Sequence, residues 1–205
     1  MYKTQQENFW AQDFGDDYIE RNQGSQLLAS NLIFFSKALK QAGKVNTCIE
    51  FGANIGMNLQ ALKLLYPKIE LKGIEINKKA SEQLKNIIGE NNVINTSIFD
   101  FEFEKKVELS LIKGVLIHIN PEMLGNVYDK LYSTSSKYIL IAEYYNPFPV
   151  TISYRGHSDR LFKRDFAGEF MKKFTDTKLI DYGFSYRNDP SFPQDDISWF
   201  LIEKI

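Results

Sequence analysis

The chain has 205 residues, of which 43% are hydrophobic and 14% aromatic, and this length and composition fit one folded domain with a sizeable core. Its formal net charge of −1 argues against a protein whose main task is to bind the nucleic acid backbone, because such proteins carry a basic surface. The single cysteine, Cys48, excludes an intrachain disulfide framework and a metal site built from several cysteines.

The N-terminal sequence, MYKTQQENFW, lacks the apolar core of a signal peptide. No apolar run in the sequence approaches the ~20 residues that a helix needs to span a bilayer. We therefore expect a soluble, cytoplasmic protein that does not enter a membrane.

The predicted elements follow one another in a regular order. A polar stretch with interleaved aromatic residues precedes a helix at 24–42, whose apolar residues recur at helical spacing. Short apolar strands then alternate with helical patterns, which is typical of βαβ units and of a mainly parallel sheet covered on both faces. The predicted strands are 46–51, 70–75, 92–97, 107–112 and 137–142, and the predicted helices are 56–66, 77–88, 121–133 and 162–174.

The last two apolar runs differ from this alternation. They cover residues 178–188 and 196–205 and are joined by the loop DPSFPQD. They predict a closing antiparallel hairpin with a long loop. We expect one α/β domain over residues 1–205, with an N-terminal part at 1–43 and a core at 44–205.

The stretch CIEFGANIGMN, residues 48–58, lies where a strand ends and a helix begins. In such a sheet, ligands bind beyond the carboxyl ends of the strands, where the strand order reverses. Gly52 can supply unusual backbone angles, Gly56 lets backbone approach a ligand closely, and Asn54 tolerates a conformation that most residues avoid. The alternative interpretation is a tight turn with no ligand.

Glu75 ends the next predicted strand, nineteen positions after Gly56. An acid there can accept hydrogen bonds from both hydroxyls of an adenosine ribose, and together with the glycine turn it indicates a nucleoside site. The dinucleotide fingerprint G-x-G-x-x-G fails at Asn54. A P-loop fails because Gly52 and Gly56 are one residue too close and Met57 stands where lysine belongs.

The pattern E-x-G-x-x-x-G, with Glu50 in the acidic position, resembles the first motif of class I S-adenosylmethionine-dependent methyltransferases. The run LSLIKGVLIHINPEML resembles the fourth strand and following loop of that family. The resemblance implies a Rossmann-like fold with a seven-stranded sheet and S-adenosylmethionine as cofactor, whose positive groups suit a nearby acid. Ser97 aligns where the family often has an acid near adenine. The cofactor-binding positions implied are Glu50, Gly52, Ala53, Asn54, Gly56, Glu75, Ile76, Ser97, Ile98, Phe99, Lys113, Gly114 and His118.

Two longer stretches resemble a narrower group, the methyltransferases associated with pseudaminic acid biosynthesis. They are FWAQDFGDDYIERN and AEYYNPFPVTISYRGHSDRLFKRDFAGEF. That group is linked to pathways that make nine-carbon acidic sugars. The resemblance implies a small-molecule acceptor, such as an acidic or nucleotide-linked sugar or amino sugar, and no nucleic acid partner.

Residues 143–165 follow the fifth predicted strand, so we expect them to form an acceptor loop over the pocket. Their arginines and lysine suit a carboxylate or phosphate on the acceptor; the alternative is a solvated loop whose arginines pair with Asp159 and Asp165. The N-terminal stretch is expected to form a lid, with Phe14 at the pocket, or else a helix at the sheet edge. The candidate substrate-binding residues are Tyr18, Arg21, Tyr144, Tyr145, Tyr154, Arg155, His157, Arg160 and Lys163.

Methyl transfer needs mainly in-line placement of the nucleophile and the methyl group. His118 and His157 titrate near neutrality, so either can take a proton from the acceptor, or else serve only as part of the pocket wall. Tyr144 can pack on the sulfonium through its ring face, or fill the pocket rim. With two histidines far apart in the sequence, we expect no metal site.

The sequence therefore predicts a monomeric or homodimeric methyltransferase for a polar small molecule. One rival function is methylation of protein or nucleic acid. Another is a non-catalytic module that binds the cofactor or a partner, because a fold by itself does not establish catalysis.

Overall fold

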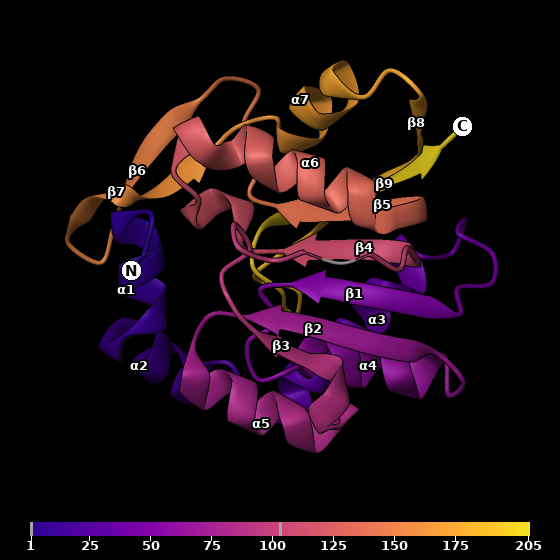
Figure 1. Ribbon diagram of the computed structural model, residues 1–205, viewed down its shortest axis with the longest axis horizontal. Helices are drawn as coiled ribbons and strands as arrows, with labels where there is room; N and C mark the ends of the chain where they lie inside the picture. Colours follow the sequence, from indigo (N-terminus) through magenta and orange to yellow (C-terminus); the bar gives the residue numbers. More distant parts are fainter. Residues whose placement is uncertain (1, 103) are drawn as a thin grey trace.

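A seven-stranded sheet forms the centre of the molecule, and helices lie on both of its faces (Figure 1). The structure is a computed structural model that describes residues 2–102 and 104–205. The strand order is β3-β2-β1-β4-β5-β9-β8. The strands of this sheet are β1 (Thr47–Phe51), β2 (Glu70–Glu75), β3 (Val93–Asn95), β4 (Val107–Lys113), β5 (Ser135–Glu143), β8 (Thr177–Ser185) and β9 (Ile197–Lys204).

The first five strands pair in parallel, and β9 pairs antiparallel with both β5 and β8. This arrangement confirms the predicted mainly parallel seven-stranded sheet with a closing C-terminal hairpin. The strand order reverses between β1 and β4, so the carboxyl ends of these two strands flank the crevice in which such sheets bind ligands.

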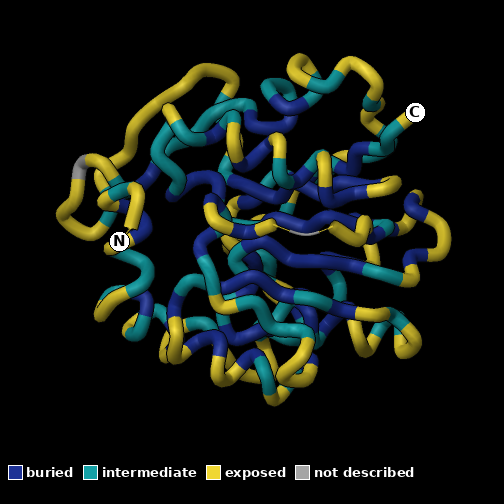
Figure 2. The backbone as a smooth tube through the Cα atoms, in the orientation of Figure 1, coloured by how far each residue is buried: buried dark blue, intermediate teal, exposed yellow. Residues whose placement is uncertain are grey.

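Helices complete the two outer layers. Buried residues of α3, α4 and α5, such as Phe35, Leu62 and Leu84, belong to one hydrophobic cluster. Residues of α6 and α7, such as Leu131 and Phe170, belong to a second cluster, and Figure 2 shows the buried strands between these layers. The α-helices are α1 (Gln5–Ala11), α2 (Asp13–Arg21), α3 (Ser25–Ala38), α4 (Met57–Leu65), α5 (Lys78–Ile88), α6 (Leu124–Thr134) and α7 (Phe166–Lys173), with short 3-10 turns η1 (Glu90–Asn92), η2 (Leu116–His118) and η3 (Pro121–Met123).

One prediction is wrong in its secondary structure. The expected loop and helix start between 143 and 165 form a separate antiparallel hairpin, in which β6 (Val150–Tyr154) pairs with β7 (His157–Lys163). Both loop residues, Arg155 and Gly156, have positive φ, 48° and 86°, which is the geometry that a two-residue hairpin loop requires. The predicted helix at 162–174 consequently begins only at Phe166, after Asp165 caps it by accepting a hydrogen bond from Gly168 N at 2.8 Å.

The N-terminal helices α1 and α2 lie off the sheet, beside the β6–β7 hairpin and in front of the arrowheads of the parallel strands (Figure 1). Helix α1 begins with a capping box, in which Glu7 N donates to the Thr4 side chain at 3.1 Å and the Glu7 carboxylate accepts from Thr4 N. The chain between 2 and 22 therefore has its own ordered structure at the carboxyl edge of the sheet. No helix in the described part of the chain is long and apolar enough to cross a membrane.

Candidate active site

A cavity of about 480 Å³ opens at the carboxyl ends of β1, β2 and β4, which is a normal size for a small-molecule site. Its floor comes from the ends of the parallel strands and its roof from α1, α2 and the β8–β9 loop. The floor residues are Gly52, Ala53, Asn54, Ile55, Met57, Asn58, Ile74, Glu75, Ile76, Asn77, Ser97, Ile98, Phe99, Lys113, Gly114, Val115, His118 and Ile119. The roof and wall residues are Thr4, Gln6, Glu7, Trp10, Gly15, Tyr18, Arg21, Asn22, Leu27, Asn31, Arg187, Pro193, Gln194, Asp195 and Ile197.

The glycine turn after β1 has the left-handed backbone that the sequence predicts. Gly52 has φ of 75° and Asn54 has φ of 48°, and the N–H groups of Gly52 and Ala53 both donate to Ile74 O at 2.9 Å. A Cβ atom on Gly52 would lie 2.6 Å from Cγ2 of Val115. The turn therefore needs glycine at position 52 both for its backbone angle and for its close contact with the segment after β4.

Gly56 serves a different purpose from the predicted one. It does not line the cavity; a Cβ atom there would meet Cδ1 of Leu84 at 2.5 Å. Its φ of 88° starts α4. Gly56 thus allows α4 to begin against α5.

Glu75 points its carboxylate into the same turn. Its two oxygens accept hydrogen bonds from Asn54 N and Asn77 N, both at 2.7 Å. Burial raises the pKa of Glu75, although the backbone N–H groups act in the opposite direction. A carboxylate has about four acceptor positions, so this one keeps free lone pairs for the two hydroxyls of a ribose, held in a fixed orientation.

Glu50 lies fully buried beneath the turn. Its Oε1 accepts a hydrogen bond from Asn58 Nδ2 at 2.6 Å, whereas its Oε2 has no partner. Burial raises the pKa of Glu50 to about 8; Asn58 and the cationic Lys113 lower it, and Glu75 raises it further. An unpaired buried carboxylate oxygen beside cavity-lining Asn58 and Lys113 fits a cationic ligand group such as an ammonium.

Replacing Glu50 with glutamine is expected to make the ligand-free protein more stable at alkaline pH. The folded-state pKa of Glu50 is raised, so its favourable contribution is complete below the unfolded value and is lost as pH rises through about 8. The glutamine amide does not titrate, so the variant does not lose this contribution. Between pH 5 and pH 8.5, the unfolding free energy of the variant should therefore rise by roughly 2–4 kcal/mol relative to that of wild type. Urea unfolding at the two pH values measures it. Glu70→Gln, at the exposed start of β2, is the control; parallel pH curves for wild type and Glu50→Gln would contradict the expectation.

His118 is held as a neutral ring at the cavity wall. Only 8% of it is exposed, its Nδ1 lies 2.6 Å from Arg160 O, and burial lowers its pKa to about 4. Because a carbonyl oxygen only accepts, Nδ1 carries the proton and Nε2 keeps its lone pair. The ring lies 4.6 Å from Trp10 and 5.3 Å from Tyr154, between ring centroids.

An aromatic cluster joins the N-terminal helices to the β6–β7 hairpin. Trp10 lies 5.1 Å from Tyr18 and 5.2 Å from Phe14, and Phe14 lies 6.0 Å from Tyr154, between ring centroids. Tyr18 and Trp10 line the cavity, and Trp10 Nε1 is buried with no hydrogen-bond partner. Of the predicted lid residues, Tyr18 and Arg21 line the cavity, whereas Phe14 does not line it and lies beneath Arg21, 5.5 Å from its guanidinium.

The residues predicted for an acceptor loop lie mostly outside the cavity. Within 143–165, no described side chain belongs to its lining. Tyr145 lies 6.1 Å from Phe200, His157 lies 5.1 Å from Phe9, Arg155 lies above Tyr154, and Lys163 lies above Tyr144. Arg160 pairs with Asp159, as the alternative interpretation expected, while Arg164 pairs with Glu169 at 3.3 Å and not with Asp165.

Tyr144 contacts the site through Asp195 of the β8–β9 loop. Burial raises the pKa of its phenol, and so does Asp195, which accepts its hydrogen bond. Asp195 lines the cavity, and Tyr18 and Tyr154 lie close enough to raise the Tyr144 pKa further. The segment after β5 therefore lies behind the cavity wall, where Tyr144 contacts Asp195 and Tyr154 of the hairpin packs on His118.

Sequence reasoning missed the β8–β9 loop as part of the site. Gln194 is buried and donates to Asn31 Oδ1 at 2.8 Å, which ties this loop to α3. Because β9 runs antiparallel to β5, the loop that precedes it lies at the carboxyl edge of the parallel strands. The predicted closing hairpin already implied this position, because the chain must enter an antiparallel last strand from the carboxyl edge of the parallel strands. Glu7 and Trp10 of α1 were missed as well.

Eleven of the predicted cofactor positions line this cavity, and only Glu50 and Gly56 do not. No group of three or more His, Cys, Asp or Glu side chains within 2–102 and 104–205 is arranged to hold a metal ion. The cavity thus combines a fixed carboxylate at a strand end, a left-handed turn and a polar rim, which suits a nucleoside with a charged tail.

Comparison with protein-family models and with curated proteins finds no match. Solved structures do match. One is the 1,6-didemethyltoxoflavin-N1-methyltransferase of Burkholderia thailandensis with bound S-adenosylhomocysteine, at 13% identity and a TM-score of 0.72, over 97% of this chain and 86% of that one. Another is the magnesium protoporphyrin IX methyltransferase of Synechocystis PCC 6803 with bound S-adenosylmethionine, at 9% identity, a TM-score of 0.68 and full coverage of both chains.

A third match is the mitomycin 7-O-methyltransferase MmcR, at 13% identity and a TM-score of 0.68. The comparison covers 98% of this chain and 61% of that one, so the present chain spans less than two thirds of its length. At these identities the likeness establishes the architecture: the chain has the Rossmann-like fold of class I methyltransferases, as predicted.

Proposed function

We propose that this protein transfers a methyl group from S-adenosylmethionine to a polar small molecule. The observation that supports this most is the Glu75 carboxylate, which the N–H groups of Asn54 and Asn77 fix at the carboxyl end of β2, one strand from the switch point of a methyltransferase fold. The three similar proteins named above are methyltransferases, and each is named after a small molecule: mitomycin, magnesium protoporphyrin IX or 1,6-didemethyltoxoflavin. The proposed acceptor is a sugar or amino sugar of the nonulosonic, pseudaminic-acid type.

The cofactor is proposed to lie along the cavity floor in one orientation, with its ribose between the base and the amino acid portion. Glu75 would accept the ribose hydroxyls, and the apolar Ile76, Ile98 and Phe99 would contact the base. The amino acid portion would lie over Gly52 and Lys113, above the unpaired oxygen of Glu50. When bound, the cofactor supplies an activated methyl group on a sulfonium.

The residues of this chain orient the acceptor and remove its proton. The acceptor oxygen or nitrogen would gain the methyl group as the cofactor sulfur gives it up, and the acceptor proton would pass to a base or to water. We propose His118 as the positioned base, because its Nε2 is unprotonated and the ring lines the cavity. Burial lowers the pKa of this ring to about 4, so His118 stays unprotonated before the transfer but is a weak base.

The acceptor is proposed to bind under the lid, against Tyr18 and against Asp195, which Tyr144 holds from behind. Arg21 and Arg187 both line the cavity and would hold a carboxylate or phosphate. They take over the role that the sequence suggested for Arg155, Arg160 and Lys163, whose side chains face other partners. In this proposal residues 2–22 act as a lid over both ligands.

Calorimetric titration with S-adenosylhomocysteine, with NAD as control, tests the proposal. Binding of the former alone is expected, followed by turnover of S-adenosylmethionine once nucleotide-linked amino sugars are screened as acceptors. Absence of S-adenosylhomocysteine binding would overturn the cofactor assignment. Binding without turnover of any small molecule, but with methylation of lysate proteins, would favour a protein acceptor, and binding with no turnover at all would favour a non-catalytic module.

A further inference from the structure

The cavity contains a carboxylate that comes from the lid and not from the sheet. We propose that Glu7, on α1, recognises the 6-amino group of the adenine base, so that the lid helix supplies the base specificity of the cofactor site. This inference rests on the proposed cofactor. It adds a specificity-determining residue that lies far in the sequence from every motif of the core.

The strand order indicates where a base would lie. Glu75 ends β2. On one side of it, Gly52 follows β1 and Lys113 ends β4, whereas Ser97 follows β3 on the other side. If the ribose of the cofactor lies at Glu75 and its charged amino acid portion lies over Gly52, the base must extend toward β3. The cavity wall there is apolar, with Ile98 and the mostly buried Phe99, and offers flat contact surface for a ring.

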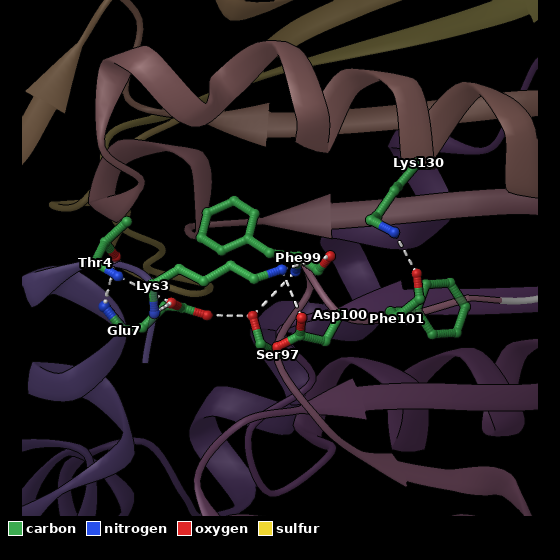
Figure 3. A network of polar contacts seen from close by, with 8 residues as sticks. All are labelled: Lys3, Thr4, Glu7, Ser97, Phe99, Asp100, Phe101 and Lys130. Carbon is green, nitrogen blue, oxygen red and sulfur yellow. Dashed lines mark hydrogen bonds and ion pairs between the residues drawn. The ribbon is translucent and has the colours of Figure 1, made fainter. Parts of the chain in front are cut away.

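Glu7 lies at this end of the cavity (Figure 3). Its Oε2 accepts hydrogen bonds from Lys3 N at 2.6 Å and from Thr4 N at 3.1 Å. Its Oε1 accepts from the Ser97 hydroxyl. Ser97 Oγ in turn accepts from Phe99 N at 3.0 Å, so its own hydrogen is free for Glu7.

These contacts leave one acceptor position of the Glu7 carboxylate without a donor. Three donors occupy three of its about four acceptor positions, and only 7% of the residue is exposed. Among the described residues, the ion pairs include none with Glu7. A buried carboxylate with a spare lone pair, at the wall of an apolar pocket, favours a ligand that donates hydrogen bonds.

This chemistry distinguishes adenine from other purines. Adenine presents a 6-amino group that donates, whereas hypoxanthine presents an oxygen that only accepts and would face the carboxylate with like polarity. Of the side chains after β3 that line the cavity, Ser97, Ile98 and Phe99, only that of Ser97 is polar, and its hydrogen is already donated to Glu7. Discrimination between the two bases consequently depends on α1.

Glu7 also has a structural role, since it completes the capping box of α1 and docks α1 on the loop after β3. The two roles make different predictions. A docking residue should affect all ligands of the pocket equally, while a base-recognising residue should change the ratio of affinities for adenine and hypoxanthine ligands. Glu7→Gln suits this comparison because its amide oxygen can still accept from Lys3 N and Thr4 N.

The experiment is calorimetric titration of S-adenosylhomocysteine and of its deaminated analogue, S-inosylhomocysteine, into wild type and three variants. Wild type should prefer the adenine ligand by about 10- to 100-fold. In Glu7→Gln this preference should fall to about unity or invert, because the amide NH₂ donates to the 6-oxygen. Ser97→Ala, which weakens docking but keeps the carboxylate, should lower both affinities in parallel, and Glu20→Gln on the exposed face of α2 should match wild type.

The outcomes are distinct. If Glu7→Gln keeps the wild-type ratio of affinities, whether or not both affinities fall, Glu7 is only a docking residue and the inference is overturned. If wild type binds S-adenosylhomocysteine but does not prefer it, the inference is overturned as well while the proposed function stands. If wild type binds neither ligand, the proposed function itself fails.

Discussion

Replacing Glu75 with alanine is expected to lower the affinity for S-adenosylhomocysteine by about 100-fold or more. Two hydrogen bonds from ribose hydroxyls to a charged acceptor contribute roughly 1.5–3 kcal/mol each, and each 1.4 kcal/mol is tenfold in affinity. The alanine also leaves the N–H groups of Asn54 and Asn77 without the acceptor that holds them. The loss should therefore include some disorder of the glycine turn.

Two further variants separate these contributions. Glu75→Gln keeps the shape and one acceptor oxygen, so its affinity should fall by about tenfold. Glu70→Gln changes an exposed acid at the other end of the same strand and should bind like wild type. Calorimetric titration of all four proteins measures the series, and unchanged affinity in Glu75→Ala would remove the ribose assignment.

Gly52→Ala is expected to lower the stability of the protein through both backbone strain and a steric clash. Its φ of 75° is strained for alanine, and its Cβ would lie 2.6 Å from Val115 Cγ2. The strain costs about 1–2 kcal/mol and the overpacking a further 1–3 kcal/mol. The unfolding free energy should fall by roughly 2–4 kcal/mol, and ligand affinity should fall with it, because the turn forms the cavity floor.

Gly43→Ala is the matched control for this substitution. Gly43 has a similar φ of 65° but has no atom within 4 Å of the position of the new Cβ. It should lose only the strain contribution of about 1–2 kcal/mol. Urea unfolding of both variants gives the comparison, and equal losses in the two would show that the Val115 contact does not constrain the turn.

The sheet could be predicted because each of its strands corresponds to a local pattern of apolar residues in the sequence. The parallel strands are short apolar runs between amphipathic helices. Because helices cover both faces of the sheet, nearly every residue of β4 and β5 is apolar or buried. The β6–β7 hairpin was missed for a related reason. It lies outside the main sheet, β6 is mostly exposed, and its two-residue loop of Arg155 and Gly156 is a weak signal without knowledge of the backbone angles.

The cofactor end of the site was equally accessible from sequence. Gly52, Asn54 and Glu75 lie on one turn and the neighbouring strand end, so the spacing of these residues along the chain largely sets their geometry. The function of Gly56 was misjudged, because its close partner Leu84 comes from a different helix. A glycine in a motif indicates that backbone must approach something, but the motif does not indicate what.

By itself, the sequence determined the α/β architecture, the left-handed turn after β1 and the acid at the end of β2, since all three depend on residues that are neighbours along the chain or in one βαβ unit. Only the tertiary structure decided which distant segments complete the cavity. Glu7 and Trp10 reach it from α1, and Asp195 reaches it from the last loop. Their positions depend on how the lid docks and how the sheet edge closes, and those are sums of many long-range packing contacts that no local pattern encodes.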